Sequence, residues 1–263
     1  MLQTFAYLGI AYLVLVVGGA LLMRNPPAGY RPAGWNPPAT QERSAADFTL
    51  GQALKTWQWY ALWALLFLNV TAGISIISQA APMAREITGV TAATAATFAG
   101  LLGIPNGAGR FLWAWLSDFI GRKWVFLAMF LIQAALFFVL PNVTSYVLFA
   151  TLSFVVLLCY GGGFGTMPAF AANYYGPGNV GSIYGLMLTA WGFGAVLGPL
   201  LIANLRQSTG AYGQALLIIA GIMLVSAIVP FIVRTPRARD AAPAAQPAPG
   251  AAEEPLRERE VGR

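Results

Sequence analysis

Apolar side chains dominate this 263-residue chain, because 58% of its residues are hydrophobic and only 9% are charged. This composition excludes a water-soluble domain of that length and indicates that the chain lies in lipid. The chain has no histidine and one cysteine, Cys159, which leaves neither a disulfide framework nor a metal site. We therefore expect no metal, no cofactor and no enzymatic activity.

Long uncharged runs predict an all-α polytopic membrane protein. Backbone groups in lipid must be hydrogen-bonded within their own segment, which favours helices. Cutting the runs at Pro, Gly, Asn and charged breaks gives about seven transmembrane helices by the ~20-residue span rule. The predicted spans cover residues 2–22, 57–80, 91–116, 124–140, 145–165, 181–203 and 212–233.

The predicted organisation is a first helix, a linker, a bundle and a tail. Residues 1–23 form the first transmembrane helix; no basic residue precedes it and Arg24 follows it, unlike in a secretory signal. Residues 24–55 form a proline-rich cytoplasmic linker, and residues 56–234 a six-helix bundle. Residues 235–263 have almost nothing apolar to bury, which predicts a disordered cytoplasmic tail.

Lysine and arginine collect on one side of the predicted helices. With the amino terminus outside, only Arg85 and Arg206 fall on the outer side. The inner side receives Arg24, Arg31, Arg43, Lys55, Arg122, Lys123, Arg234, Arg237 and Arg239. The positive-inside rule then predicts a multi-pass protein of the plasma (inner) membrane with a cytoplasmic carboxyl terminus. This bias accounts for most of the net charge of +6, so we predict no nucleic-acid partner.

Arg110 lies inside the third predicted span, where an ionised side chain is costly and is usually functional. Eight helical residues separate it from Asp118 at the inner boundary, a rise of ~12 Å. Gly103, Asn106 and Gly107 share its helical stripe. Because a guanidinium holds a carboxylate through two parallel hydrogen bonds, Arg110 is the predicted binding group for a small anion. The alternative is a structural arginine paired with a carboxylate or with backbone carbonyls.

Polar and aromatic residues at similar depth could complete a pocket around Arg110. These candidates are Asn106, Asn69, Tyr160, Thr189 and Trp191, with Tyr184 as a further one. Tyr160 and Trp191 could equally be helix-packing residues.

A charged turn follows the third predicted span, and we call its four residues Asp118, Gly121, Arg122 and Lys123 the exit turn. Such charges at an inner helix end can lock against neighbouring helices in one state and release in another, as a conformational latch. The alternative is that Arg122 and Lys123 are inner-face anchors.

Glycines also recur at intervals of four, which lets helices approach closely. These pairs are Gly103 and Gly107, Gly161 and Gly165, Gly181 and Gly185, and Gly194 and Gly198.

Several short motifs together resemble the oxalate/formate antiporter family of the major facilitator superfamily. They are Asn25-Pro-Pro-Ala-Gly-Tyr30, Gly34-Trp35-Asn-Pro-Pro38, Lys55-Thr-Trp-Gln-Trp-Tyr60, Asn69-Val-Thr-Ala-Gly73, Leu116-Ser-Asp-Phe-Ile-Gly-Arg-Lys123, Met167-Pro-Ala-Phe170 and Leu188-Thr-Ala-Trp191. The resemblance implies a twelve-helix carrier of which this chain supplies the carboxyl-terminal half, helices six to twelve. It also implies a substrate-contacting arginine on the helix that carries Arg110.

The function expected from these features is transport of a small organic anion by alternating access. Nothing basic occurs between Lys123 and Arg206, whereas the resemblance implies a second cation on the eleventh helix of an oxalate carrier. A single cation favours a monocarboxylate such as formate, pyruvate or lactate over oxalate. The expected partners are this substrate, the lipid bilayer and a missing amino-terminal half or partner chain. The alternatives are a non-transporting membrane interaction partner, a degenerate half-transporter and a seven-helix receptor.

Overall fold

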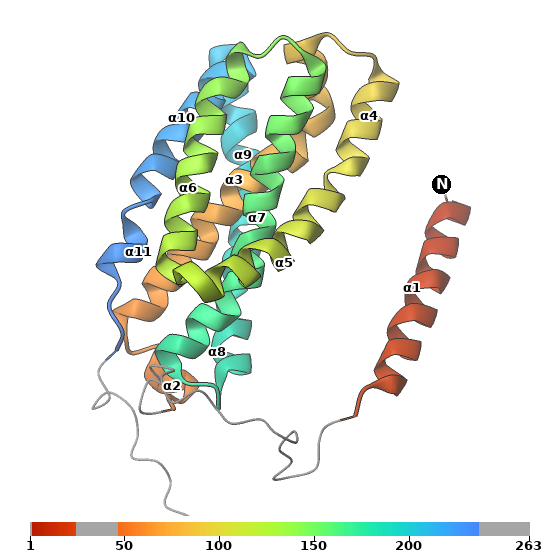
Figure 1. Ribbon diagram of the computed structural model, residues 1–263. Coiled ribbons are helices and arrows are strands. Elements are labelled where there is room, and N and C mark those ends of the chain that lie inside the picture. The colour runs from red at the N-terminus through yellow and green to blue at the C-terminus, as the bar shows by residue number, and fades with distance from the viewer. Residues whose placement is uncertain (1, 25–46, 237–263) are drawn as a thin grey trace, which may run out of the picture. The chain divides into compact units, whose positions relative to one another are not determined.

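The computed structural model describes residues 2–24 and 47–236, and the regular structure in these residues is entirely helical (Figure 1). They fall into two units, residues 1–41 and 42–263. The first unit holds α1 (Leu2–Leu22), which coincides with the first predicted span. Most of the predicted linker and nearly all of the predicted tail lie outside the described residues.

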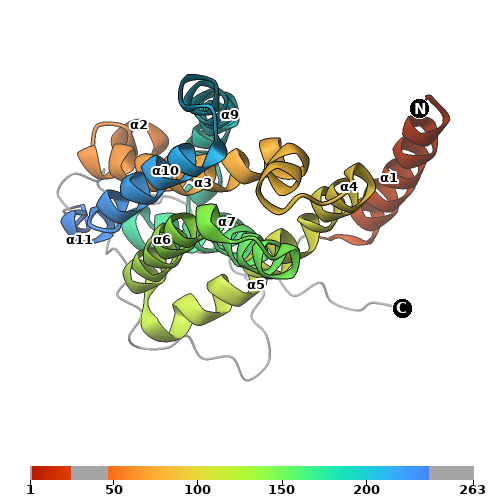
Figure 2. The same ribbon diagram turned by 90° about the horizontal axis from the view of Figure 1, so that it is seen from above.

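The second unit is a helical bundle (Figures 1 and 2). Its elements are α2 (Leu50–Ala53), α3 (Trp57–Thr88), α4 (Ala92–Leu101), α5 (Gly103–Ile120), α6 (Arg122–Val139), the 3-10 turn η1 (Leu140–Asn142), α7 (Tyr146–Tyr175), α8 (Val180–Met187), α9 (Thr189–Thr209), α10 (Tyr212–Ser226) and α11 (Val229–Ile232). The all-α, polytopic fold class is confirmed. Across the described residues, six helical stretches, α1 among them, are long and apolar enough to cross a membrane.

The predicted span 91–116 is not one continuous helix but two, α4 and α5. The chain breaks at Leu102, which ends α4 and begins α5. Pro105 has no N–H to donate to the carbonyl four residues before it, and the next bond, from the Asn106 N–H to the Leu102 carbonyl, is long at 3.4 Å. The helix is therefore interrupted about two turns before it reaches Arg110.

Two other predicted spans were too short because proline and glycine were treated as helix ends. The helix α3 continues through Pro82 to Thr88, and α7 continues through Gly165 and Pro168 to Tyr175. Membrane helices tolerate such residues, because neighbouring helices and local adjustment satisfy the freed backbone groups.

The helix α7 lies among α3, α5, α6 and α8 and contacts each of them (Figure 2). Two of the four predicted glycine pairs provide close packing. Gly161 and Gly165 meet the backbone of α5, whereas Gly194 and Gly198 meet α3. The pairs on α5 (Gly103, Gly107) and α8 (Gly181, Gly185) have no atom of the described residues within 4 Å of an added Cβ.

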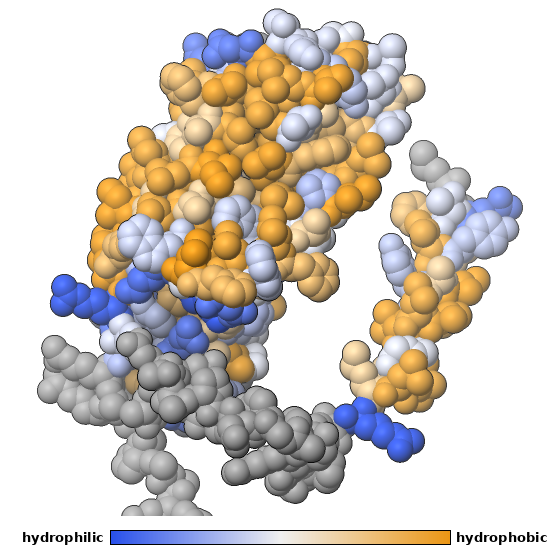
Figure 3. Space-filling view, viewed as in Figure 1, coloured by the Kyte–Doolittle hydropathy of each residue, from blue (hydrophilic) through white to orange (hydrophobic). Residues whose placement is uncertain are grey.

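The surface of the bundle in Figure 3 is mostly apolar over its middle and more hydrophilic at its ends. Large apolar side chains of the bundle such as Phe111, Phe138 and Val147 are exposed, with 81%, 64% and 72% of their surface accessible. This pattern suits a lipid environment rather than water.

Part of the predicted linker is ordered against the turn between α7 and α8. Asp47 accepts a hydrogen bond from the Gly178 N–H at 3.1 Å, and the Phe48 N–H donates to the Tyr175 carbonyl at 2.9 Å. The Asn179 side chain donates to the Phe48 carbonyl at 3.0 Å, and Phe48 is fully buried. Residues 47–48 are therefore anchored to the start of α8.

Candidate functional site

Arg110 lies near the middle of the bundle on α5. The helix is continuous from Gly103 to Ile120, so Arg110 stands ~12 Å along its axis from Asp118. Its side chain is exposed, and its guanidinium carbon lies 5.2 Å from the centroid of the Phe164 ring on α7. Within residues 2–24 and 47–236 the ion pairs are Arg122–Asp118 and Arg206–Glu86. Arg110 therefore carries its charge at bundle depth without a described carboxylate beside it.

Two aromatic residues of α7, Tyr160 and Phe164, form a pair on the side of this guanidinium. The Tyr160 ring packs edge-on against Phe164, with the ring centroids 5.3 Å apart. Tyr184 on α8 is half-buried, and Trp191 on α9 has 50% of its surface accessible. Gly73 of α3 leaves room for the Tyr160 ring, because a Cβ at position 73 would collide with that ring.

Two asparagines bring carboxamide groups toward the same part of α7. Asn69 is fully buried; its Nδ2 donates to the Cys159 carbonyl at 3.3 Å, and its Oδ1 has no partner in the described structure. The Oδ1 of the half-buried Asn106 also has no partner there. Unpaired buried acceptors are uncommon in proteins, so these two atoms are available for a further hydrogen bond.

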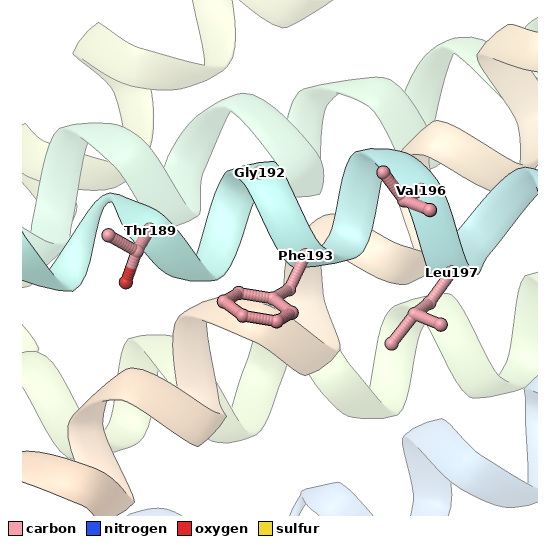
Figure 4. Close-up of a pocket in the computed structure, with 5 residues that line it drawn as sticks. All are labelled: Thr189, Gly192, Phe193, Val196 and Leu197. Atoms are coloured by element: carbon pink, nitrogen blue, oxygen red, sulfur yellow. The ribbon is translucent and has the colours of Figure 1, made fainter.

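Thr189 lies on a different face of α9 from Trp191. Its hydroxyl accepts a hydrogen bond from the Trp63 Nε1 at 2.9 Å. Thr189 is also the polar residue of a cavity of about 590 Å³ on α9, whose other lining residues are Gly192, Phe193, Val196 and Leu197 (Figure 4). These five positions share one stripe of the helix, and Trp191 lies outside it.

The exit turn joins α5 to α6. Arg122 forms an ion pair with Asp118 at 2.6 Å and donates to the Ser117 hydroxyl at 3.0 Å. Between them Gly121 adopts φ of 90°, a backbone conformation that side chains disfavour. Lys123 instead donates to the Val233 carbonyl at 2.7 Å, which also accepts from the Tyr174 hydroxyl at 2.9 Å.

Three predicted pocket residues from other helices, Arg110, Asn106 and Asn69, contact residues 159–165 of α7. Tyr160 lies within that segment, whereas Thr189 lies in the α9 cavity. Sequence reasoning missed Phe164, which touches Arg110, and Trp63, which binds Thr189. The spacing of four residues between Tyr160 and Phe164 was the available signal, since it places both rings on one helical face.

Comparison with known proteins gives the family and the fold. Residues 62–261 match the sequence model of the Major Facilitator Superfamily. The chain is 28% identical to Apicoplast pyruvate carrier 1 of Toxoplasma gondii, in a match covering 70% of this chain and 39% of that protein. It is 24% identical to the Oxalate:formate antiporter of Oxalobacter formigenes, in a match covering 86% of this chain and 54% of that protein. The chain thus spans about half the length of these relatives or less.

A solved structure supports the same fold. The crystal structure of the E. coli fucose:proton symporter matches with a TM-score of 0.65 at 19% identity. The match covers 89% of this chain and 55% of that one.

Proposed function

The chain belongs to the Major Facilitator Superfamily, and we propose that it forms the anion-binding bundle of a carrier for a small organic monocarboxylate. It is an integral membrane protein of a family whose members are transporters. In this proposal the substrate is a molecule such as formate, pyruvate or lactate, and Arg110 binds its carboxylate.

The proposal depends on the guanidinium of Arg110. It is an exposed cation on a helix of the bundle, and its guanidinium carbon lies over the Phe164 ring, 5.2 Å from the centroid. Stacking on an aromatic ring leaves the N–H groups at the edge of the guanidinium free, and two of them match the spacing of carboxylate oxygens. Lysine cannot reproduce this paired geometry.

The surrounding residues suit a small carboxylate. Tyr160, Phe164 and Trp191 form an aromatic wall that would keep water from the ion pair and so strengthen it. The free Oδ1 atoms of Asn106 and Asn69 are hydrogen-bond acceptors that would suit the hydroxyl group of lactate, which formate and pyruvate lack. Thr189, which the sequence placed in the same pocket, lines the cavity on α9 instead.

The charge of the site favours one carboxylate over two. Arg206 is the next basic residue after Lys123, and Glu86 holds it through hydrogen bonds of 3.0 and 2.7 Å. A second carboxylate would therefore find no free cation on α7, α8 or α9. The names of the two curated relatives include pyruvate and formate, which are monocarboxylates, as well as oxalate.

Transport by alternating access needs a second bundle to close the pathway, since inward and outward states arise by rocking two bundles about a central site. We propose that this bundle is an amino-terminal half or a partner chain. The exit turn is then a latch, with Lys123 binding the end of α11 in one state and releasing it in another. We also propose the plasma membrane as the location, with a cytoplasmic carboxyl terminus.

Binding of labelled formate, pyruvate, lactate and oxalate to the purified protein in nanodiscs tests this function. We expect a monocarboxylate to bind more tightly than oxalate. Arg110→Ala and Arg110→Lys should both abolish binding while membrane insertion and thermal stability stay at the wild-type level. Equal binding by Arg110→Ala would remove Arg110 from the site, and a wild-type protein that binds none of the four anions would refute the proposed function.

A further inference from the structure

The middle of α7 contains the sequence Gly161-Gly162-Gly163-Phe164-Gly165. Each glycine inside a helix costs about 1 kcal/mol relative to alanine, so four within five residues are expensive. The structure explains this cost, because a Cβ at any of the four positions would collide with a neighbouring helix. The obstacle differs from one glycine to the next.

Two of these glycines face the backbone of α5. A Cβ at Gly161 would fall on the carbonyl oxygen of Asn106, and one at Gly165 on the carbonyl oxygen of Arg110. In return, a Cβ on Gly109 of α5 would fall on the Leu158 carbonyl of α7. The two backbones thus touch, in the arrangement that allows Cα–H groups to contact carbonyl oxygens across a helix pair.

Arg110 is consequently held at both ends by consecutive residues of α7. Its carbonyl lies against Gly165, and its guanidinium lies over the ring of Phe164. The distance between the α5 and α7 backbones at Gly165 determines whether the Arg110 guanidinium reaches the Phe164 ring. The neighbouring carboxamide of the buried Asn69 also points at this segment, with its unpaired Oδ1 against Gly163.

We propose that Gly161 and Gly165 are positioning residues that set the place of the Arg110 guanidinium in the binding site. They act by admitting the α5 backbone into contact with α7, and their own atoms do not touch the substrate. The proposal rests on the proposed function in that it takes Arg110 as the anion-binding group.

The chain supplies matched controls for this idea. Gly162 lies beside Gly161, and there a Cβ would meet the side chains of Trp113 and Met129 rather than the backbone of Arg110. Gly107 lies on the same helix as Arg110, and a Cβ there meets no atom of the described residues within 4 Å. Gly162→Ala therefore presses on the side chains of Trp113 on α5 and Met129 on α6 and not on the α5 backbone, and Gly107→Ala adds a methyl group that meets no described atom.

The test compares these variants in three measurements: the Kd for the bound monocarboxylate, the unfolding temperature, and the rate at which phenylglyoxal modifies Arg110, followed by mass spectrometry. Gly165→Ala should weaken binding about tenfold or more and change the modification rate severalfold, with Gly161→Ala acting in the same direction. Gly162→Ala should lower the unfolding temperature but leave the Kd and the modification rate within twofold. Gly107→Ala should leave the Kd and the modification rate at the wild-type level and should not lower the unfolding temperature, since alanine is the better helix former.

Equal effects of Gly165→Ala and Gly162→Ala on the Kd and on Arg110 modification would overturn the proposal, because a general loss of packing would then explain both. Unchanged Arg110 modification in Gly165→Ala would overturn it as well. If the wild type binds no carboxylate while Gly165→Ala alone changes the modification rate, the proposed function fails and the positioning role stands.

Discussion

Phe164 and Arg110 show how a membrane bundle can hold a cation without neutralising it. A carboxylate beside the guanidinium would satisfy its charge and close it to a substrate. An aromatic ring attracts the face of the cation and leaves its edge free to bind. In this bundle the guanidinium carbon of Arg110 lies 5.2 Å from the centroid of the Phe164 ring, and no carboxylate of the described residues pairs with it.

Replacing Phe164 by leucine tests this contact at the residue scale. A cation–π contact contributes about 0.5–2 kcal/mol depending on its exposure to water, so Phe164→Leu should weaken carboxylate binding roughly 2- to 30-fold. Phe164→Tyr keeps the ring and should bind within about twofold of the wild type. Titration of the labelled monocarboxylate measures both, and equal loss in the two variants would contradict a role for the aromatic face.

At the scale of elements, the turn between α7 and α8 is bound by residues that precede α3. Asp47 occupies the space beside Gly176 and Gly178, and a Cβ on either glycine would collide with it. Gly176 also has φ of 80°, which a side chain disfavours. The start of α8, the helix of Tyr184, is thus attached to the segment that leads into α3.

Asp47→Ala removes the acceptor of the Gly178 N–H. Loss of such a bond costs about 1 kcal/mol, so the unfolding temperature should fall and the turn at residues 176–179 should be cut faster by a protease. Asp47→Asn retains a carbonyl acceptor, so its unfolding temperature and its rate of proteolysis should lie between those of Asp47→Ala and those of the wild type. If Asp47→Ala is cut at the same rate as the wild type, the Asp47 contact does not order the turn.

How far the sequence predicts these elements depends on which forces decide each one. Hydropathy alone located the apolar runs, because crossing a bilayer requires length and apolarity. It could not locate the break at Leu102 or the passage of α7 through Pro168, since both depend on whether neighbouring helices satisfy the backbone. Arg110 was identifiable from the cost of its charge, whereas Phe164 was one aromatic residue among 16 phenylalanines until α5 was placed against α7.

At the scale of the second unit, polar contacts tie the helices together at both ends of the bundle. Near the end of α3, Glu86 binds Arg206 on α9 and accepts the Tyr212 N–H of α10 at 3.1 Å. At the other end, Lys123 of α6 and Tyr174 of α7 both bind the carbonyl of Val233, just after α11. Between these ends, glycine contacts hold α5, α7, α3 and α9 at close range.

Glu86→Ala and Lys123→Met should therefore destabilise the bundle independently. The two sites share no partner and lie at opposite ends, so the fall in unfolding temperature of the double variant should equal the sum of the single falls. Glu86→Gln keeps an acceptor for Tyr212 and should have a smaller effect than Glu86→Ala. Differential scanning fluorimetry in one detergent measures all four variants. If the unfolding temperature of the double variant is no lower than that of either single variant, the two sites do not contribute independently to stability.

The ion pair in the exit turn also decides where a reporter of motion should be placed. Asp118 and Arg122 are four residues apart, so the tether of chain between them keeps them near each other whatever the rest of the bundle does. Spin labels or fluorophores on that pair would give one constant separation. Lys123 and Val233 are 110 residues apart along the chain, and labels attached there would register any parting of α6 from α11.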